Sequence, residues 1–125
     1  MGYYANGSGL VVTRPLSVNE KAKLLKKIQA TGIGNFESDA FSVVFLSLEG
    51  KEGKEVITID IEHSDNYHEE NTYDFLRKIA PYVETGEIEF TGEEHDNWRF
   101  HFRNGKWYED NGIVTYDEKK GKEIY

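Results

Sequence analysis

Apolar and polar residues alternate most clearly over residues 86–118, GEIEFTGEEHDNWRFHFRNGKWYEDNGIVTYDE. Short runs with an apolar residue at every second position are typical of strands that bury one face. Asn104-Gly105 and Asn111-Gly112 suit the two positive φ angles of a type I′ turn. This stretch therefore predicts a meander of four antiparallel strands.

The register of this meander assigns its side chains to two faces, because the side-chain period of a strand is two. The buried face is predicted to carry Ile88, Phe90, Trp98, Phe100, Phe102, Trp107, Val114 and Tyr116. The other face sets Glu87 and Glu89 across from a row made by Arg99, His101 and Arg103. Glu109 falls on the apolar face, either at the solvent-exposed rim or buried with a partner, and we expect the rim.

Three further strands are predicted upstream, over residues 3–13, 40–48 and 55–61. In the first, the insert Asn6-Gly7-Ser8-Gly9 predicts a bulge or turn. The second has apolar residues on both faces, which favours a central position. In the third, an isoleucine row alternates with Val56, Thr58 and Asp60. Residues 50–54 form the hairpin loop between the last two.

Two helices complete the pattern. Ser17-Val18-Asn19-Glu20 is a capping box that opens a helix running to about Ala30. Its predicted buried stripe is Val18, Ala22, Leu24, Leu25 and Ile28. A polar segment, residues 62–74, leads into the second helix, which is expected to begin near Tyr67 because Asn66 and Glu69 have capping-box spacing. Its predicted stripe is Thr72, Phe75, Leu76, Ile79 and Val83.

The predicted order is β-α-β-β-α-β-β-β-β, an α+β fold with both helices packed on one face of an antiparallel sheet. We expect a single domain over residues 1–118 and a frayed tail over residues 119–125.

Composition excludes several classes of function. The formal charge of −8 argues against a protein that binds nucleic acid directly by neutralising phosphates. The absence of cysteine excludes disulfides, thiolate chemistry and cysteine-based zinc sites. No secretory signal is visible and no apolar run approaches the ~20 residues of a membrane span, so we expect a cytoplasmic protein that does not bind membranes.

Candidate chemistry is sparse, and we predict no catalytic residue, metal site or cofactor. His63 and His68 lie in an acidic segment, but their spacing does not place them on one helical face, so a solvated helix-capping segment is the preferred interpretation. His95, Arg99, His101 and Arg103 could converge as an anion site in a small enzyme or ligand-binding domain. They fit the polar face of an amphipathic strand equally well.

The clusters of Asp and Glu residues are the feature of the sequence that points most directly to a function. The predicted partner-binding residues are Glu62, Asp65, Glu69, Glu70, Glu87, Glu89, Glu93, Glu94 and Asp96. Carboxylates on a rigid sheet can imitate a row of phosphates and occupy a basic groove of a nucleic-acid enzyme. We therefore expect a non-enzymatic protein that binds a basic protein surface. A structural protein that associates through a sheet edge is a third possibility.

Both ends of the chain resemble a family of small uncharacterised proteins from actinobacteria and their phages. At the start the similar residues are Met1-Gly2-Tyr3-Tyr4 and Arg14-Pro15-Leu16. Near the end they are Gly92-Glu93-Glu94, Asp96, Trp98-Arg99 and Asn104-Gly105-Lys106. The resemblance implies a phage or mobile-element context and no residue role. The most concrete version of the predicted binding function is an inhibitor of a host nucleic-acid enzyme, of the anti-CRISPR type, which acts in the host cytoplasm.

Overall fold

The computed structural model describes residues 3–28, 34–35, 40–94, 96–111 and 122–123. The helices are α1 (Val18–Lys27) and α2 (Glu69–Ile79), and a short 3₁₀ helix, η1 (Ala80–Tyr82), follows α2. The strands are β1 (Tyr3–Thr13), β2 (Gly34–Asn35), β3 (Val43–Glu49), β4 (Val56–Tyr67), β5 (Val83–Gly92), β6 (Asn97–Arg103), β7 (Lys106–Asn111) and β8 (Lys122–Glu123).

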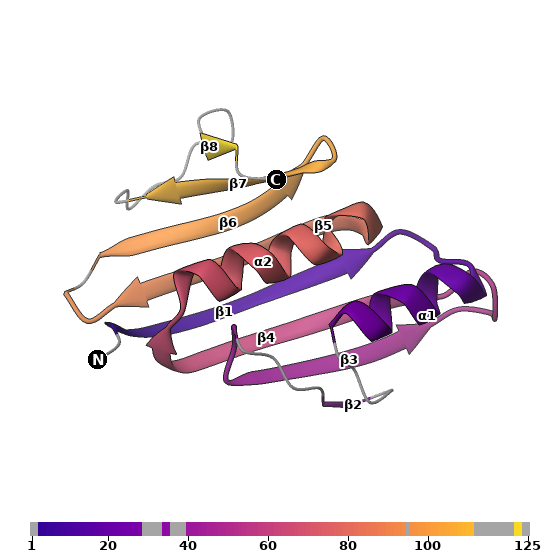
Figure 1. Cartoon of the computed structure of the whole chain (residues 1–125), viewed down its shortest axis with the longest axis horizontal. Helices are drawn as coiled ribbons and strands as arrows, with labels where there is room; N and C mark the ends of the chain where they lie inside the picture. The colour runs from indigo at the N-terminus through magenta and orange to yellow at the C-terminus, as the bar shows by residue number, and fades with distance from the viewer. Residues whose placement is uncertain (1–2, 29–33, 36–39, 95, 112–121, 124–125) are drawn as a thin grey trace.

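In this part of the chain all strands join one antiparallel sheet in the order β2-β3-β4-β1-β5-β6-β7-β8. Both helices lie on the same side of the sheet (Figure 1). The α+β class and the order of helices and strands are therefore as predicted, with β2 as an addition. The predicted strand around Val114 and Tyr116, and the turn at Asn111-Gly112, include residues outside the described part. The strand that pairs with β7 is β8.

β1 is the centre of the sheet, because it pairs along most of its length with β4 on one side and β5 on the other. The bulge predicted at Asn6-Gly7-Ser8-Gly9 is wrong: these residues pair regularly, and the register shift lies at Val12/Thr13. The glycines serve packing instead. A Cβ on Gly7 would lie 2.4 Å from Cδ1 of Phe90, so the absent side chain makes room for that ring.

β4 is longer than predicted and extends through the polar segment to Tyr67. Its extra residues pair with the first half of β1, which supplies backbone partners that the local sequence does not reveal. The capping box predicted at Asn66 and Glu69 is therefore wrong, and α2 begins after His68, whose side chain makes no cap hydrogen bond. The capping box of α1 is confirmed: Glu20 N–H donates to Ser17 Oγ at 3.1 Å, and Ser17 N–H donates to Glu20 Oε1 at 3.0 Å.

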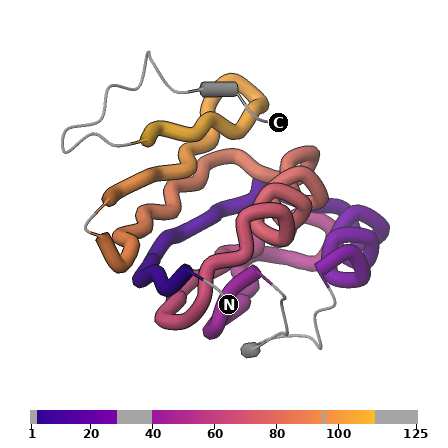
Figure 2. The backbone as a smooth tube through the Cα atoms, turned by 60° about the vertical axis from the view of Figure 1, so that its left-hand side comes forward, coloured from indigo at the N-terminus to yellow at the C-terminus, as the bar shows by residue number. Residues whose placement is uncertain are grey.

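The core lies between the sheet and the helices. The α2 stripe is buried as predicted at Thr72, Phe75, Leu76 and Ile79, whereas Val83, its last predicted member, is the first residue of β5. The isoleucine row of β4 is buried beneath the helices. The stripe of α1 is only partly as predicted. Leu24 and Ile28 are buried, whereas Val18 is 47% exposed and Ala22 is exposed. α1 lies over one corner of the sheet, so few of its residues reach the core (Figures 1 and 2).

The β6–β7 hairpin has the predicted turn and register. Asn104 and Gly105 have φ angles of 52° and 79°, and Phe102 pairs with Trp107. The expectation that Glu109 sits at an exposed rim is wrong. Glu109 is only 7% exposed, and its Oε1 accepts a 2.8 Å hydrogen bond from the hydroxyl of Tyr73 on α2. The side chain of Tyr73 reaches this point of the sheet from α2 and provides the donor that permits burial.

Candidate protein-binding surface

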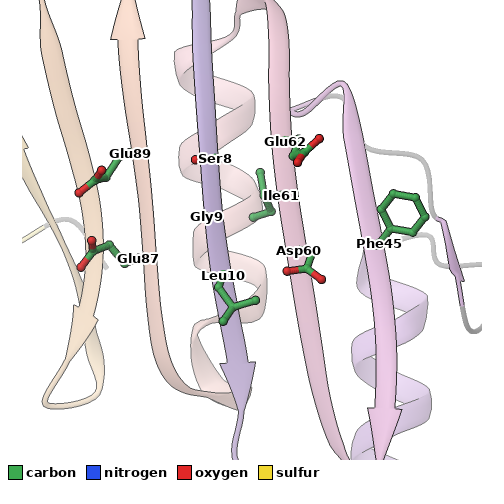
Figure 3. Close-up of a pocket in the computed structure, with 9 residues that line it drawn as sticks. All are labelled: Ser8, Gly9, Leu10, Phe45, Asp60, Ile61, Glu62, Glu87 and Glu89. Atoms are coloured by element: carbon green, nitrogen blue, oxygen red, sulfur yellow. The ribbon is translucent and has the colours of Figure 1, made fainter.

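The open face, defined as the side of the sheet away from α1 and α2, presents two parallel rows of side chains. The strand registers place each row across six neighbouring strands, from β3 to β7. One row is Val43, Glu62, Ser8, Glu89, Arg99 and Asp110. The next is Phe45, Asp60, Leu10, Glu87, His101 and Tyr108. Figure 3 shows the middle of both rows, with the helices behind the sheet.

Four carboxylates frame the middle of the open face. Asp60 and Glu62 belong to β4, Glu87 and Glu89 belong to β5, and β1 runs between these strands. Two strand spacings separate the pairs by about 10 Å at the backbone, and two residues along a strand span about 7 Å. We call this arrangement the carboxylate rectangle. It borders a shallow hollow of about 760 Å³.

Apolar side chains lie in and beside the carboxylate rectangle. Leu10 occupies the central strand and is 47% exposed, and Phe45 lies next to Asp60 and is 48% exposed. Val43 is exposed in the neighbouring row. Exposed apolar residues rimmed by charge are typical of surfaces that contact another molecule.

The charge of the rectangle is poorly balanced locally. Glu87 lies 3.5 Å from Arg99, and its side chain is half exposed. Within the described part of the chain, Asp60, Glu62 and Glu89 make no ion pair and no side-chain hydrogen bond. No Lys or Arg lines the hollow. The result is a negative field over an apolar centre, which attracts cationic groups of a partner.

The structure does not unite the nine predicted partner-binding residues. Glu62, Glu87 and Glu89 contribute to the rectangle. Glu69 and Glu70 begin α2 on the helix side of the sheet, and Asp65 lies near the end of β4, where its carboxylate accepts from the backbone of Asn66. Glu93, Glu94 and Asp96 belong to the turn between β5 and β6.

The turn between β5 and β6 holds the beginning of β1 in place through hydrogen bonds. The carboxylate of Glu93 accepts from the backbone N–H of Tyr4, and the hydroxyl of Tyr3 donates to Asp96. The backbone N–H of Glu94 donates to the Tyr3 hydroxyl at 3.2 Å. Glu93 and Asp96 therefore have structural partners within the described part of the chain, unlike Asp60, Glu62 and Glu89 of the carboxylate rectangle.

Sequence reasoning missed Asp60, Leu10 and Phe45 as parts of the surface. The alternation of residues 40–48 and 55–61 assigns Phe45 and Asp60 to definite faces of their own strands. What the pattern lacks is the position of β1 between β4 and β5, which joins these faces into one surface.

The cationic row of β6 is built into the fold. Arg99 and His101 are buried on the open-face side and converge on Asp110 of β7. Asp110 Oδ2 lies 2.8 Å from Arg99 Nη2 and 3.3 Å from His101 Nε2. The guanidinium of Arg103 stacks over the ring of Tyr108 at 4.3 Å. His95, the fourth member of the predicted anion site, lies outside the described residues.

The histidine in the acidic segment of β4 also has internal partners. Nδ1 of His63, a buried side chain, accepts from the backbone N–H of Ser42 at 3.2 Å, and its Nε2–H donates to the carbonyl of Asn66 at 2.9 Å. Among the described residues no three His, Asp or Glu side chains are grouped closely enough to hold a metal ion. No helix in the described ranges is long and apolar enough to cross a membrane.

No family model, curated protein or solved structure matches this chain.

Proposed function

We propose that the protein is a non-enzymatic binding protein whose open face engages a basic surface of a partner protein. The observation that carries the proposal is the carboxylate rectangle around Leu10, in which three of the four acids have no ion-pair partner in the described part of the chain. Unpaired like charges grouped on one face of a sheet repel one another, so their grouping calls for a reason outside folding.

The dimensions of the rectangle define the partner. Cationic groups must reach two lines of carboxylates about 10 Å apart while an apolar group covers Leu10. Arg suits this task because its planar guanidinium can bind a carboxylate through two hydrogen bonds. Phe45, beside Asp60, offers a second apolar contact and a face for cation–π stacking.

The most concrete version of the partner is a host nucleic-acid enzyme with a basic groove, bound by a phage-encoded inhibitor of the anti-CRISPR type. Such a groove is already selected to bind rows of negative groups, and a rigid acidic sheet competes with nucleic acid for it. The open face supports this version through its charge and its apolar centre.

The experiment compares two variants of equal net charge. Glu62→Lys with Glu89→Lys reverses the two corners of the rectangle that share one row, and Glu52→Lys with Glu84→Lys reverses exposed acids outside the hollow. Binding is measured by fluorescence anisotropy with a labelled peptide, Gly-Arg-Arg-Leu-Arg-Arg-Gly, and by co-purification of host proteins with each variant.

We expect the first variant to lose both interactions and the second to retain them. We also expect wild-type binding to weaken steeply between 0.1 and 1 M salt, because the Debye length falls from about 10 Å to about 3 Å. Equal binding by the two variants, or binding that is indifferent to salt, contradicts the proposal. A peptide with Gly in place of Leu tests the apolar contact separately.

A further inference from the structure

A second cavity, distinct from the open face, lies on the helix side at the end of the sheet where β1 and α2 begin. It has a volume of about 420 Å³, a size suited to a small ligand. Its wall includes the side chains of Tyr3, Tyr67, Trp98, Glu69, Asp96 and Glu109. Three carboxylates therefore surround it, and no Lys, Arg or His contributes to its lining.

Glu109 is the deepest of these acids. Its side chain is 7% exposed, and the Tyr73 hydroxyl holds Oε1. Burial, together with this hydrogen bond, raises the pKa of the Tyr73 hydroxyl, so Tyr73 stays a neutral donor at physiological pH. No ion pair within the described ranges engages Glu109. A buried carboxylate without a countercharge is costly, and a bound cation would offset that cost.

The aromatic residues add a surface suited to a cation. The rings of Tyr67 and Trp98 meet edge to face with centroids 4.9 Å apart, and Phe90 stacks behind Trp98 at 5.4 Å. Tyr67 and Trp98 line the cavity, and ring faces of this kind attract ammonium and guanidinium groups.

Two polar groups in this wall make no hydrogen bond of ordinary geometry in the described structure: the hydroxyl of Tyr67 and the indole N–H of Trp98, a side chain only 6% exposed. Trp98 and Thr72 are close enough to the Tyr67 hydroxyl to interact with it electrostatically. A buried polar group without a partner points to a ligand or water that satisfies it. The indole N–H can only donate, so it requires an oxygen acceptor, whereas the Tyr67 hydroxyl can accept from an N–H group.

We propose that this cavity binds a guanidinium or ammonium group that carries a carbonyl oxygen nearby, as in an arginine or lysine residue. The cation contacts Glu109 and the aromatic rings, and the exposed acids Glu69 and Asp96 extend the negative field to the mouth. The proposal is independent of the function assigned to the open face, since none of these side chains lines the hollow there.

The test uses the two tryptophan indole N–H signals in ¹H–¹⁵N NMR spectra. Trp98 lies in the cavity wall, whereas Trp107 is fully buried against Phe102 and serves as an internal control. Trp98→Phe assigns the two signals. The probes are N-acetyl-arginine amide and its neutral counterpart, N-acetyl-citrulline amide. Agmatine and the peptide acetyl-Gly-Arg-Gly-amide distinguish a free amine from a chain-borne side chain.

We expect the arginine probe to shift the Trp98 signal in a saturable way, leave Trp107 unmoved, and bind on the order of tenfold more tightly than citrulline, the scale of one charge-assisted hydrogen bond. Glu109→Gln, which preserves an acceptor for Tyr73, should weaken arginine binding by a similar factor. Glu94→Gln, an exposed acid outside the lining, should not.

Tighter binding of the peptide than of agmatine would support a protein side chain as the ligand, and the reverse would overturn the requirement for a carbonyl oxygen, because agmatine carries none. Absence of a Trp98 shift at millimolar arginine, or equal shifts with citrulline, would overturn the proposal. If Glu109→Gln does not fold, Glu69→Gln provides the same comparison from the exposed side of the cavity, and unchanged arginine affinity in it would count against the site.

Discussion

The ion pair between Arg99 and Asp110 should be a main electrostatic determinant of stability. Both side chains are almost fully buried, with 6% and 4% of their surfaces exposed, and Asp110 Oδ2 lies 2.8 Å from Arg99 Nη2. At an effective dielectric constant of 20, two unit charges at this distance attract by about 6 kcal/mol before desolvation is counted. Removing one partner of a buried pair costs about 3–5 kcal/mol.

Asp110→Ala is therefore expected to lower the free energy of unfolding by about 3–5 kcal/mol, a large fraction of the 5–15 kcal/mol typical of a domain. Glu87→Ala is the matched control, because Glu87 pairs with the same arginine at 3.5 Å but its side chain is 50% exposed. An exposed pair contributes about 0.2–1 kcal/mol.

Urea unfolding at pH 7, followed by far-UV circular dichroism, measures both losses. A third variant, Asp110→Leu with Arg99→Met, removes both buried charges and should recover most of the stability lost in Asp110→Ala. Similar losses in Asp110→Ala and Glu87→Ala, or a loss below about 1 kcal/mol in the former, would refute the assignment of this pair as a buried, structurally essential one.

Three further predictions concern folding. The hydrogen bond from Arg14 lowers the pKa of Glu20 to about 2, so the stability that Glu20 contributes is complete above its unfolded-state pKa near 4.5 and is lost as the pH falls through about 2. The difference in unfolding free energy between wild type and Glu20→Gln, measured from pH 7 to pH 2, should therefore shrink over that interval. A constant difference would contradict the shift. Gly7→Ala should destabilise the protein by about 1–3 kcal/mol, because the new methyl group would lie 2.4 Å from the Phe90 ring, and a thermal melt that matches wild type would show that the ring relaxes freely. Gly105→Ala should cost roughly 1 kcal/mol, because φ is 79° in an open turn that presents no steric contact, and unchanged urea unfolding would show that this conformation is not strained for alanine.

The local elements follow from the sequence wherever one short-range rule governs them. The Ser17/Glu20 capping box starts α1 because both hydrogen bonds form within one turn. The Asn104-Gly105 turn forms because those residues tolerate positive φ, and the two-residue loop then determines the pairing of Phe102 with Trp107. The period-two pattern also identifies the buried faces of the strands.

Errors arose where a distant segment supplies the deciding interaction. The polar end of β4 is a strand because β1 pairs with it, and β1 runs straight through its glycine-rich insert because Phe90 fills the space above Gly7. Glu109 is buried because α2 carries Tyr73 to it. None of these partners is near in sequence.

The candidate sites show the same division. The sequence by itself determined which residues are acidic and assigned Asp60, Glu87 and Glu89 to their strands and faces, because composition and side-chain period are properties of the chain. It left Glu62 in a polar segment outside the predicted strand. Only the tertiary structure decided that β1 lies between β4 and β5, which gathers Asp60, Glu62, Glu87 and Glu89 around Leu10. It also separated these acids from Glu69, Asp96 and Glu109, which gather with Tyr67 and Trp98 at another cavity. The reason is that strand order in an antiparallel sheet depends on pairing between segments distant in sequence. The backbone hydrogen bonds that form these pairs involve no side chain, so the pattern of side chains does not reveal them.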